Sequence, residues 1–598
     1  MVKTERIRYI FKTFWDTFGG YKRQILLMSG LGFMGSITEG IGIGSMIPLL
    51  SLAGGSSAAG TDVLSQAIQK AFLFLHLPFT IKFILIGIFL MFLLRTVFIF
   101  LSNYVTALIV NDFQLNMRKR LFALTLGSRW EYLAKQKMGH LEQSLTTIVD
   151  TGPHIFKQMS SLLMLSFALL VYTVLAMNVS VIATLGSLGL VVVSFLILKP
   201  LFYRTRAASK ETEVWYRDIA HHINQTMIGI KSIKAGAAEN AFLTKADQLF
   251  TKYKKLDLRL TIINAFIGAL SKPLSILFIL LLFVFFYKIQ GFEYPSFIVI
   301  VYAIYRIFNY SEGIQHEVNK LNTTVPYLNS LQDFESDVRK QQEADKGQGQ
   351  FKFNRAIEFK NVFFNYEGGR EVLNGLGFQI SKGETIGLIG PSGAGKTTIV
   401  DLLLRLYQPK TGEILVDGID VSLISMREWR KQIGYVPQDP FLLNDSIANN
   451  IKFYNPAITD VKMREAATLA QSIDFIESQP QGFETVVGDR GVLLSGGQRQ
   501  RIVLAKILAQ SPKILILDEA TNALDAESEQ AIKQTIKQLH GKMTIIIIAH
   551  RPSTVVDVGR ILVLNQGRIV EEGKPATILS DKTSYFYKMY QAGIYGLN

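Results

Sequence analysis

Long apolar runs dominate the first half of the chain, and charged segments separate them. Six runs reach the roughly 20 residues that an α-helix needs to cross a bilayer. They lie near residues 25–53, 79–110, 155–177, 179–203, 260–287 and 295–316. The third and fourth runs are separated by Met177-Asn178, which predicts a tight turn outside the membrane. The pattern therefore predicts six membrane-spanning helices.

Charged residues between the runs predict the orientation of the chain. Basic side chains are concentrated in two loops, between runs two and three and between runs four and five: Arg118, Lys119, Arg120, Arg129, Lys135, Lys137, Arg204, Arg206, Lys231, Lys234, Lys252, Lys254 and Lys255. The opposite loops carry Lys70, Lys82 and Lys288. Because Lys and Arg favour cytoplasmic loops, we expect a protein of the cell (inner) membrane with both termini cytoplasmic.

The loops on the two sides differ in character. Both basic loops are long and read as helical arms, interrupted by short cross-pieces at Ser128–Ala134 and Ala235–Asn240. In the outside loop Gly54–Pro78, apolar residues recur at helical spacing from Val63 to Leu75. This spacing predicts an amphipathic helix, lying either on the outer membrane surface or against the helix bundle.

The pattern changes after residue 330. A polar segment between Asp333 and Gln350 reads as a linker. Short β-rich runs then alternate with helical stretches: 357–363, 385–389, 414–416, 433–436, 514–517, 544–548 and 560–564. Such alternation is typical of an α/β domain with a parallel sheet. We therefore expect an all-α transmembrane domain (1–330), a linker (331–352) and an α/β domain (353–598).

Composition supports a chain that lies partly in lipid. Hydrophobic residues make up 49% of the chain and charged residues 19%. The net charge of +15 raises the question of nucleic-acid binding. The basic residues lie beside the apolar runs, however, which favours membrane topology over a nucleic-acid partner. Cysteine is absent, and Met1–Arg23 lacks the pattern of a cleavable signal peptide, so the first run is expected to stay as an anchor.

A glycine-rich segment follows the predicted strand at 385–389. It consists of Gly390, Pro391, Ser392, Gly393, Ala394, Gly395, Lys396 and Thr397, with Thr398 opening a predicted helix to Leu406. The strand–loop–helix context is the one that a phosphate loop requires. Its backbone N–H groups would point at phosphate oxygens. Lys396 would reach the β- and γ-phosphates of ATP, and the Thr397 hydroxyl would bind Mg²⁺. A chance glycine-rich turn is the alternative.

Two adjacent carboxylates end the apolar run Ile514–Leu517. Asp518 at the strand end is placed to hold the water shell of Mg²⁺. Glu519 points elsewhere and is the natural general base for the attacking water. The alternative is a simple capping pair before the next helix, which the phosphate loop upstream makes less attractive.

A third motif lies between the phosphate loop and the carboxylate pair. Ser495, Gly496, Gly497 and Gln498 precede an apolar helix predicted over Arg499–Leu508. A helix N-terminus with Ser and exposed glycine N–H groups is an anion site. In combination with the phosphate loop and the carboxylate pair, this segment resembles the signature of the ABC ATPases. Together with the six runs, the chain resembles a homodimeric bacterial half-size ABC exporter.

The resemblance implies further roles. Tyr366 matches the aromatic residue that stacks on adenine, and Gln438 matches the glutamine that contacts Mg²⁺ and the cross-pieces. Asp525 belongs to a segment that resembles the D-loop, with Asn522 where Ser is usual. His550 matches the switch histidine that contacts the γ-phosphate; a structural strand-end histidine is the alternative. The exporter-type loop before the signature is matched by Gly488–Gly491, with Asp489 where Glu is commoner.

The family mechanism needs the phosphate loop of one domain to face the signature of another. This chain has one of each, so a second copy is the expected partner, with a heterodimer as the alternative. ATP would clamp two ATPase domains together, and the clamp would turn the spans from inward- to outward-facing. Hydrolysis at Glu519 would reset the cycle.

Charges inside the runs are the best indication of the cargo. Glu39, Arg95, Lys272 and Arg306 are each expected near the middle of the bilayer, where unpaired charge is costly. Three cations and one acid suggest a site for an anionic headgroup, such as a lipid phosphate. The alternative is a Glu39–Arg ion pair with cations that face the cytoplasmic mouth.

The sequence is compatible with several classes of cargo. The basic spans, the outside helix and the segment Gly40–Pro48 give a diffuse resemblance to the branch that flips lipid-linked oligosaccharides. Membrane lipids are thus both expected neighbours and candidate cargo. A multidrug or peptide exporter, an importer, and an ATP-gated channel or regulator on the same scaffold are the alternatives. A soluble ATPase of the DNA-repair kind would lack the six runs.

Overall fold

The structure is a computed structural model that describes residues 14–53, 63–287, 294–345, 347–520, 525–549 and 551–595. The chain forms two compact units. The first comprises Met1–Ser128 and Tyr132–Gln342, and the second comprises Arg129–Glu131 and Glu343–Asn598. Lys288, Asn522, His550 and the start of the outside loop lie outside the described residues.

The described part of the first unit is built from helices. Its elements are η1 (Gly19–Tyr21), α2 (Lys22–Gly44), α3 (Met46–Ala53), α4 (Val63–Phe74), α5 (Ile81–Leu126), α7 (Met138–Gln143), the π-helical η2 (Ser144–Ile148), α8 (Val149–Thr151), α9 (His154–Val179), α10 (Val181–Ile228), α11 (Ile230–Ala235), α12 (Glu239–Tyr287) and α13 (Tyr294–Lys340). The short α6 (Trp130–Lys135) lies across the division between the units.

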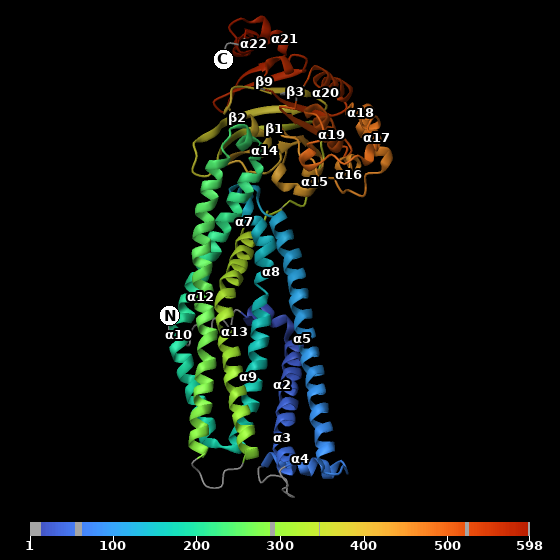
Figure 1. Ribbon diagram of the computed structural model, residues 1–598. Coiled ribbons are helices and arrows are strands. Elements are labelled where there is room, and N and C mark those ends of the chain that lie inside the picture. Colours follow the sequence, from blue (N-terminus) through green and yellow to red (C-terminus); the bar gives the residue numbers. More distant parts are fainter. Residues whose placement is uncertain are drawn as a thin grey trace. The chain divides into compact units, whose positions relative to one another are not determined.

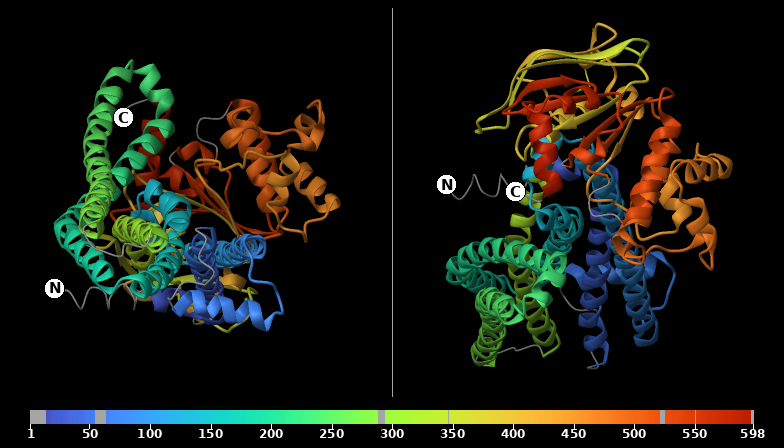
Figure 2. Two further views of the ribbon diagram at one scale, coloured as in Figure 1. Left: turned by 60° about the horizontal axis from the view of Figure 1, so that its bottom comes forward. Right: turned by 90° about the horizontal axis from the view of Figure 1, so that it is seen from above.

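Six helical stretches in the described part of the chain are long and apolar enough to cross a membrane. They are Phe14–Ala53, Ile81–Leu126, Gly139–Val179, Val181–Ile228, Glu239–Val284 and Phe297–Lys340. The predicted six spanning helices are confirmed by these lengths and compositions. Helices α10 and α12 pack together on one side of the bundle, and α2 and α5 pack together on the other (Figures 1 and 2). Helix α13 contacts α9, α10 and α12.

Several predicted boundaries shift in the structure. The turn placed at Met177-Asn178 lies at Ser180, because α9 continues to Val179 and the Ser180 hydroxyl accepts a hydrogen bond from the Ala183 N–H at the start of α10. Helix α13 continues past the predicted linker start at residue 331 to Lys340, since Leu331, Phe334 and Val338 are buried in the core. Internal packing thus extends both helices beyond their apolar runs.

The short elements between the long helices also differ from the prediction. The predicted cross-piece Ser128–Ala134 overlaps α6, which ends one residue later, whereas α11 ends at Ala235, where the other cross-piece was expected to begin. The outside helix is α4, and its Ser65 and Ile68 are buried while Val63, Leu73 and Phe74 are exposed. One face of α4 therefore packs against the other helices of the first unit, which agrees with the predicted alternative of a helix lying against the bundle.

The second unit contains two sheets. The strands are β1 (Ala356–Asn365), β2 (Glu371–Ser381), β3 (Thr385–Ile389), β4 (Thr411–Val416), β5 (Ile419–Asp420), β6 (Ile433–Val436), β7 (Ile514–Asp518), β8 (Thr544–Ala549), β9 (Arg560–Asn565) and β10 (Arg568–Gly573). One sheet is antiparallel, in the order β2-β1-β4-β5, and the other has the order β10-β9-β3-β8-β7-β6. In the second sheet, β9, β3, β8, β7 and β6 are parallel.

Helices pack around these sheets. They are α14 (Lys396–Leu403), α15 (Met426–Lys431), α16 (Ile447–Lys452), α17 (Asp460–Leu469), α18 (Ile473–Glu477), α19 (Gly496–Leu508), α20 (Ala526–Leu539), α21 (Pro575–Ser580) and α22 (Tyr585–Tyr595), with the short turns η3 (Val421–Leu423), η4 (Gly482–Glu484), η5 (Asp489–Gly491) and η6 (Pro552–Thr554). Every residue of β3, β7 and β8 is buried. Strands that are covered on both faces have nearly continuous apolar sequences, which explains the apolar runs at these positions. Six long helical spans followed by an α/β domain, as the sequence predicted, are confirmed.

Candidate functional site

The carboxyl ends of three central strands meet at one edge of the parallel sheet. Ile389 of β3 is paired in register with Ala549 of β8, and Ile548 of β8 is paired with Asp518 of β7. The glycine-rich loop after β3 and the carboxylates after β7 therefore emerge at the same edge. In open α/β sheets, this edge is where ligands bind.

The glycine-rich loop has the backbone that a phosphate cradle needs. Gly393 and Gly395 have φ angles of +77° and +106°, a region that residues with a Cβ rarely adopt. A Cβ on Gly390 would overlap the carbonyl oxygen of Leu564 on β9. Helix α14 begins directly after Gly395, two residues earlier than predicted, so its first N–H groups open toward the loop.

Lys396 lies under this loop. It is 5% exposed, and its ammonium donates hydrogen bonds to the carbonyl oxygens of Gly390 and Pro391, at 2.8 and 3.0 Å. Burial lowers the pKa of Lys396, while the charges of Glu519 and Asp518 oppose that shift. A buried cation whose hydrogen bonds, within the described residues, go to neutral carbonyl groups is suited to exchange them for the oxygens of an anionic ligand.

The two carboxylates after β7 have different surroundings. Asp518 is buried and accepts a hydrogen bond from the Tyr435 hydroxyl at 3.2 Å. Glu519 has a φ of +49°, which is rare for a residue with a side chain and indicates local backbone strain. Its carboxylate accepts a hydrogen bond from the Gln438 amide at 2.8 Å. The two acids thus have different hydrogen-bond partners, Tyr435 for Asp518 and Gln438 for Glu519.

Tyr435 is a neighbour that the sequence reasoning missed. It belongs to β6, which is paired in register with β7. Burial and the adjacent Asp518 raise the pKa of the Tyr435 hydroxyl, so it remains a hydrogen-bond donor. Only strand order reveals this contact, because the two residues are far apart in sequence.

Oxygen donors for a magnesium ion are present at this edge. The Thr397 hydroxyl, the Gln438 amide oxygen and the Asp518 carboxylate are the hard oxygen ligands that Mg²⁺ prefers. No group of three or more His, Cys, Asp or Glu side chains in the described ranges could hold a metal by itself. This donor set therefore fits Mg²⁺ bound together with phosphate oxygens and water, as is usual for this ion.

The segment Ser495–Gln498 forms the start of α19. The Ser495 hydroxyl accepts a hydrogen bond from the Gln498 N–H at 3.2 Å, and the Gln498 side chain accepts one from the Ser495 N–H at 3.0 Å. This capping box starts the helix at Gly496, earlier than the predicted Arg499. Gly497 is buried, and a Cβ there would overlap the Ser528 side chain of α20.

Asp525 lies beside the same helix start. The position that a Cβ on Gly497 would take is 3.1 Å from the Asp525 carboxylate. A hydrogen bond from Ser528 lowers the pKa of Asp525, which keeps it ionised. Asn522 and His550, the other residues of the predicted set near this edge, lie outside the described residues.

Tyr366 is held against α14. Its hydroxyl lies 3.0 Å from the Thr398 hydroxyl and donates to the Asp401 carboxylate at 3.5 Å. The ring packs edge-to-face against Phe364 and Tyr407. Burial raises the pKa of Asp401 to about 6, the Tyr366 bond lowers it, and the charge of Asp518 raises it. The sequence reasoning missed Asp401, which is one more charge within the electrostatic reach of Asp518.

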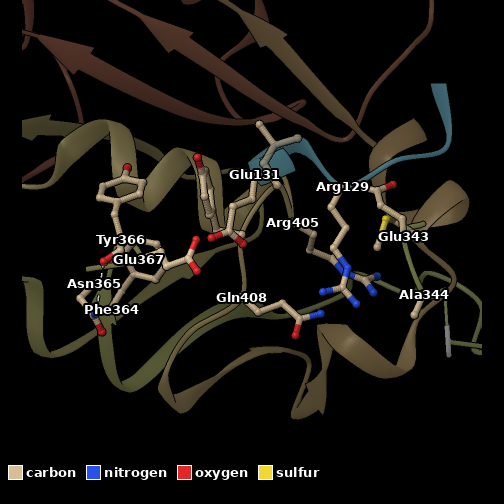
Figure 3. Close-up of a pocket in the computed structure, with 13 residues that line it drawn as sticks. Arg129, Glu131, Glu343, Ala344, Phe364, Asn365, Tyr366, Glu367, Arg405 and Gln408 are labelled. Carbon is tan, nitrogen blue, oxygen red and sulfur yellow. Dashed lines mark hydrogen bonds between the residues drawn. The ribbon is translucent and has the colours of Figure 1, made fainter. Parts of the chain in front are cut away.

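A pocket of about 280 Å³ in the second unit also borders Tyr366. Figure 3 shows Tyr366 and Glu367 at one end, with Arg405 and Gln408 farther along and Arg129 at the other end. None of residues 390–398, all of which the structure describes, lines it. The pocket is therefore a separate hollow and not the phosphate site.

The first unit contains a second charged cluster. Glu39 of α2 is 3% exposed and forms ion pairs with Arg95 of α5, at 2.9 Å, and with Arg306 of α13. The hydroxyls of Tyr172 and Tyr310 each donate to its carboxylate at 3.0 Å. Three of the four predicted mid-span charges thus meet. Lys272 is exposed on α12 and is not among these partners of Glu39.

Known proteins place this arrangement in a family. The model described as "ABC transporter transmembrane region" matches residues 41–309, and the one described as "ABC transporter" matches residues 373–522. The "Heterocyst differentiation ATP-binding protein HepA" of Nostoc sp. is 32% identical over 500 residues, covering 80% of each protein. The chain belongs to the ABC transporter family. It is therefore an ATPase coupled to transport, and a multi-pass membrane protein.

Other relatives match a shorter part of this ABC transporter. The "Alpha-hemolysin translocation ATP-binding protein HlyB" of Escherichia coli O157:H7 is 48% identical over 236 residues, 39% of this chain and 33% of that protein. The "ATP-binding cassette sub-family B member 6" of Mesocricetus auratus is 44% identical over 250 residues, 41% of this chain and 30% of that protein. Matches of this length are too short to include both units.

One solved structure shares the fold of nearly the whole chain. It is titled "Structure of a bacterial Atm1-family ABC exporter with ATP bound" and has a TM-score of 0.75 at 24% identity. The match covers 96% of this ABC transporter and 98% of that chain. The six-helix unit and the ATPase unit thus have the exporter fold.

Proposed function

We propose that this ABC transporter is one half of a homodimeric exporter that moves an amphipathic, anionic cargo out of the cytoplasm. The observation that carries the proposal is the joining, in one chain, of six spanning helices to one phosphate loop and one signature helix. A complete ATP site needs both elements from facing domains. The exposed Ser495 and Gly496 at the start of α19 are free of steric obstruction for such a partner.

The residues at the sheet edge take these roles in the proposal. Lys396 exchanges the carbonyls of Gly390 and Pro391 for the β- and γ-phosphate oxygens of ATP, and the loop N–H groups, from Gly390 to Thr398, bind the remaining oxygens. Thr397, Gln438 and Asp518 hold Mg²⁺, which neutralises the phosphate charge when bound. Tyr366 offers a face of its ring to adenine.

Hydrolysis is assigned to Glu519. Its carboxylate accepts a proton from the attacking water, and the strained backbone at this residue directs it away from Asp518. Gln438 now holds this carboxylate by a hydrogen bond, so it can orient Glu519 and respond to the bound nucleotide. His550 would contact the γ-phosphate, and the signature residues Ser495, Gly496, Gly497 and Gln498, with Asp525 beside them, come from the second copy.

The cargo class rests on the first unit. Two arginines against one carboxylate leave a net positive charge among helices α2, α5 and α13. Such charge inside a membrane span indicates a function. The relatives named for hemolysin translocation match too little of the chain to bring a polypeptide cargo with them, and the flippase resemblance gains no support from the relatives. An anionic amphiphile, with lipid as one case, is the class that the charges favour.

Complementation between two inactive chains tests the shared ATP site. Lys396→Ala and Ser495→Arg should each abolish ATP hydrolysis alone. Mixed dimers should recover activity, because one of their two sites combines an intact loop with an intact signature. Absence of recovery in confirmed mixed dimers would reject the shared site.

Transport is tested with vesicles that hold the protein with its ATPase units outside. ATP should deplete fluorescent phosphatidylglycerol from the outer leaflet, and Glu519→Gln should not. Depletion of a cationic amphiphile alone would support a multidrug exporter, and an ATP-dependent ion conductance without depletion would support a channel.

A further inference from the structure

The Glu39 cluster joins four helices at one depth of the first unit. Its members come from α2, α5, α9 and α13. Arg95 lies about 20 Å from the start of α5, and Arg306 about 18 Å from the start of α13, at 1.5 Å per residue. A hydrocarbon core is about 30 Å thick, so both arginines lie well inside it. Charge at that depth is costly unless it is paired or faces a water-filled cavity.

Exposure within the cluster is uneven. The Glu39 side chain is 5% exposed, whereas those of Arg95 and Arg306 are 29% and 22% exposed. The carboxylate is therefore enclosed, whereas each arginine keeps part of its side chain accessible. An anion could approach the accessible part of each arginine without first reaching Glu39.

Arg306 also retains one unused donor, although another of its N–H groups donates to the Tyr310 hydroxyl. The Nε atom of Arg306 is buried and makes no hydrogen bond in the described structure. The guanidinium of Arg306 lies over the rings of Tyr172 and Tyr310, at 5.3 and 4.6 Å from the ring centres. Aromatic faces stabilise a cation but accept no strong hydrogen bond. An oxyanion would supply the missing acceptors.

These contacts define a competition. We propose that the anionic group of the cargo displaces Glu39 from Arg95 and Arg306, so that cargo binding and release of α2 from α5 and α13 are one event. The inference rests on the proposed function and names the recognition chemistry: a phosphate- or carboxylate-type oxyanion. On displacement, the Glu39 carboxylate keeps its hydrogen bond from Tyr172 and loses the one from Tyr310.

The competition makes a signed prediction for each partner. Removing Glu39's charge or one of its hydrogen bonds favours the incoming anion, whereas removing an arginine disfavours it. A purely structural cluster would give no gain in anion affinity from any variant. The sign of the Glu39 and Tyr310 variants is therefore the decisive readout.

The experiment uses the full-length protein in phosphatidylcholine vesicles with increasing phosphatidylglycerol. Phosphatidylglycerol retained after solubilisation is counted without nucleotide, and stimulation of ATP hydrolysis is measured separately. Glu39→Gln should lower the half-saturating phosphatidylglycerol fraction about tenfold, the equivalent of one charge-assisted hydrogen bond. Tyr310→Phe should lower it about threefold, as expected for a weaker neutral bond. Arg95→Gln and Arg306→Gln should lose retention and stimulation.

The controls separate the possible sources and failures. Lys82→Gln, which removes an exposed cation at the start of α5, should change nothing. Inorganic pyrophosphate serves as the lipid-free arm: binding equal to that of phosphatidylglycerol would assign the anion to a soluble cargo. If Glu39→Gln does not fold, the Tyr310→Phe shift decides.

Unchanged retention in Arg306→Gln, or unchanged affinity in both Glu39→Gln and Tyr310→Phe, would overturn the inference. Different results would reject the proposed function: ATP hydrolysis that does not depend on Glu519, or no recovery of activity in the mixed dimers. Lipid retention without nucleotide is independent of both.

Discussion

Glu39 and Glu519 show how differently the two units use a carboxylate. Glu39 is enclosed by two arginines and two tyrosines, and its charge is satisfied within the bundle. Glu519 is partly buried on a strained turn beside Gln438, at a sheet edge that opens toward a ligand. Within a membrane, a charge without a partner is costly unless it faces water. In the ATPase unit, water can solvate a carboxylate, so it needs no charged partner and can act as a base.

The largest expected effect is on hydrolysis. Glu519→Gln keeps the shape and the bond partner but removes the proton acceptor, so ATP turnover should fall by about 10²- to 10⁴-fold. Nucleotide binding should persist, because Lys396 and the loop are untouched. Turnover and equilibrium binding of a fluorescent ATP analogue are the measurements. Glu527→Gln, on the exposed face of α20, is the matched control. Normal turnover in Glu519→Gln would move the base elsewhere.

The stability of the first unit should depend on the Glu39 carboxylate. Glu39→Ala removes the buried counterion of two partly buried arginines, which should lower the unfolding free energy of the first unit by about 3–5 kcal/mol. Glu239→Ala breaks an exposed ion pair with Lys234 and should lower it by about 1 kcal/mol or less. Thermal unfolding in detergent compares the two variants. Equal losses would mean that the Glu39 cluster is solvated like a surface pair.

Two neighbouring glycines give a smaller, steric contrast within the ATPase unit. A Cβ on Gly497 would overlap Ser528, whereas a Cβ on Gly496 meets nothing within 4 Å. Gly497→Ala should therefore lower the unfolding free energy by about 1–3 kcal/mol, and Gly496→Ala should leave it nearly unchanged. Chemical unfolding measures the difference. Equal destabilisation by both variants would show that α19 and α20 are not packed as described.

The smallest expected effect concerns Asp401. Burial raises its pKa from 3.8 to about 6, so between these values the folded protein binds more protons than the unfolded chain. Stability should then fall as the pH rises through this window, and the loss should persist at neutral pH. Asp401→Asn should remove this dependence and stabilise the ATPase unit by about 1 kcal/mol or less, since solvent screens the group. Melting temperatures from pH 4 to 7.5 test this, with exposed Asp474→Asn as the control.

Local patterns in the sequence predicted most of the ATPase edge. The strands at 385–389 and 433–436 have the predicted bounds, and the loop from Gly390 to Thr397 lies where its context required. Strands β2, β5 and β10 were missed. β2 carries glycine and asparagine in its interior, β5 has two residues, and β10 is an edge strand with alternating exposure. Such strands are stabilised by their neighbours more than by their own composition.

The sequence by itself determined the number of spanning helices, the order of the two units and the residue types of the phosphate loop. These follow from periodicity and chain-local geometry, which act over a few residues. Only the tertiary structure decided that Tyr435 contacts Asp518, that Gln438 holds Glu519, and that Glu39 is shared by Arg95 and Arg306 while Lys272 is not among its partners. Those contacts join residues far apart along the chain, and helix packing and strand order select them.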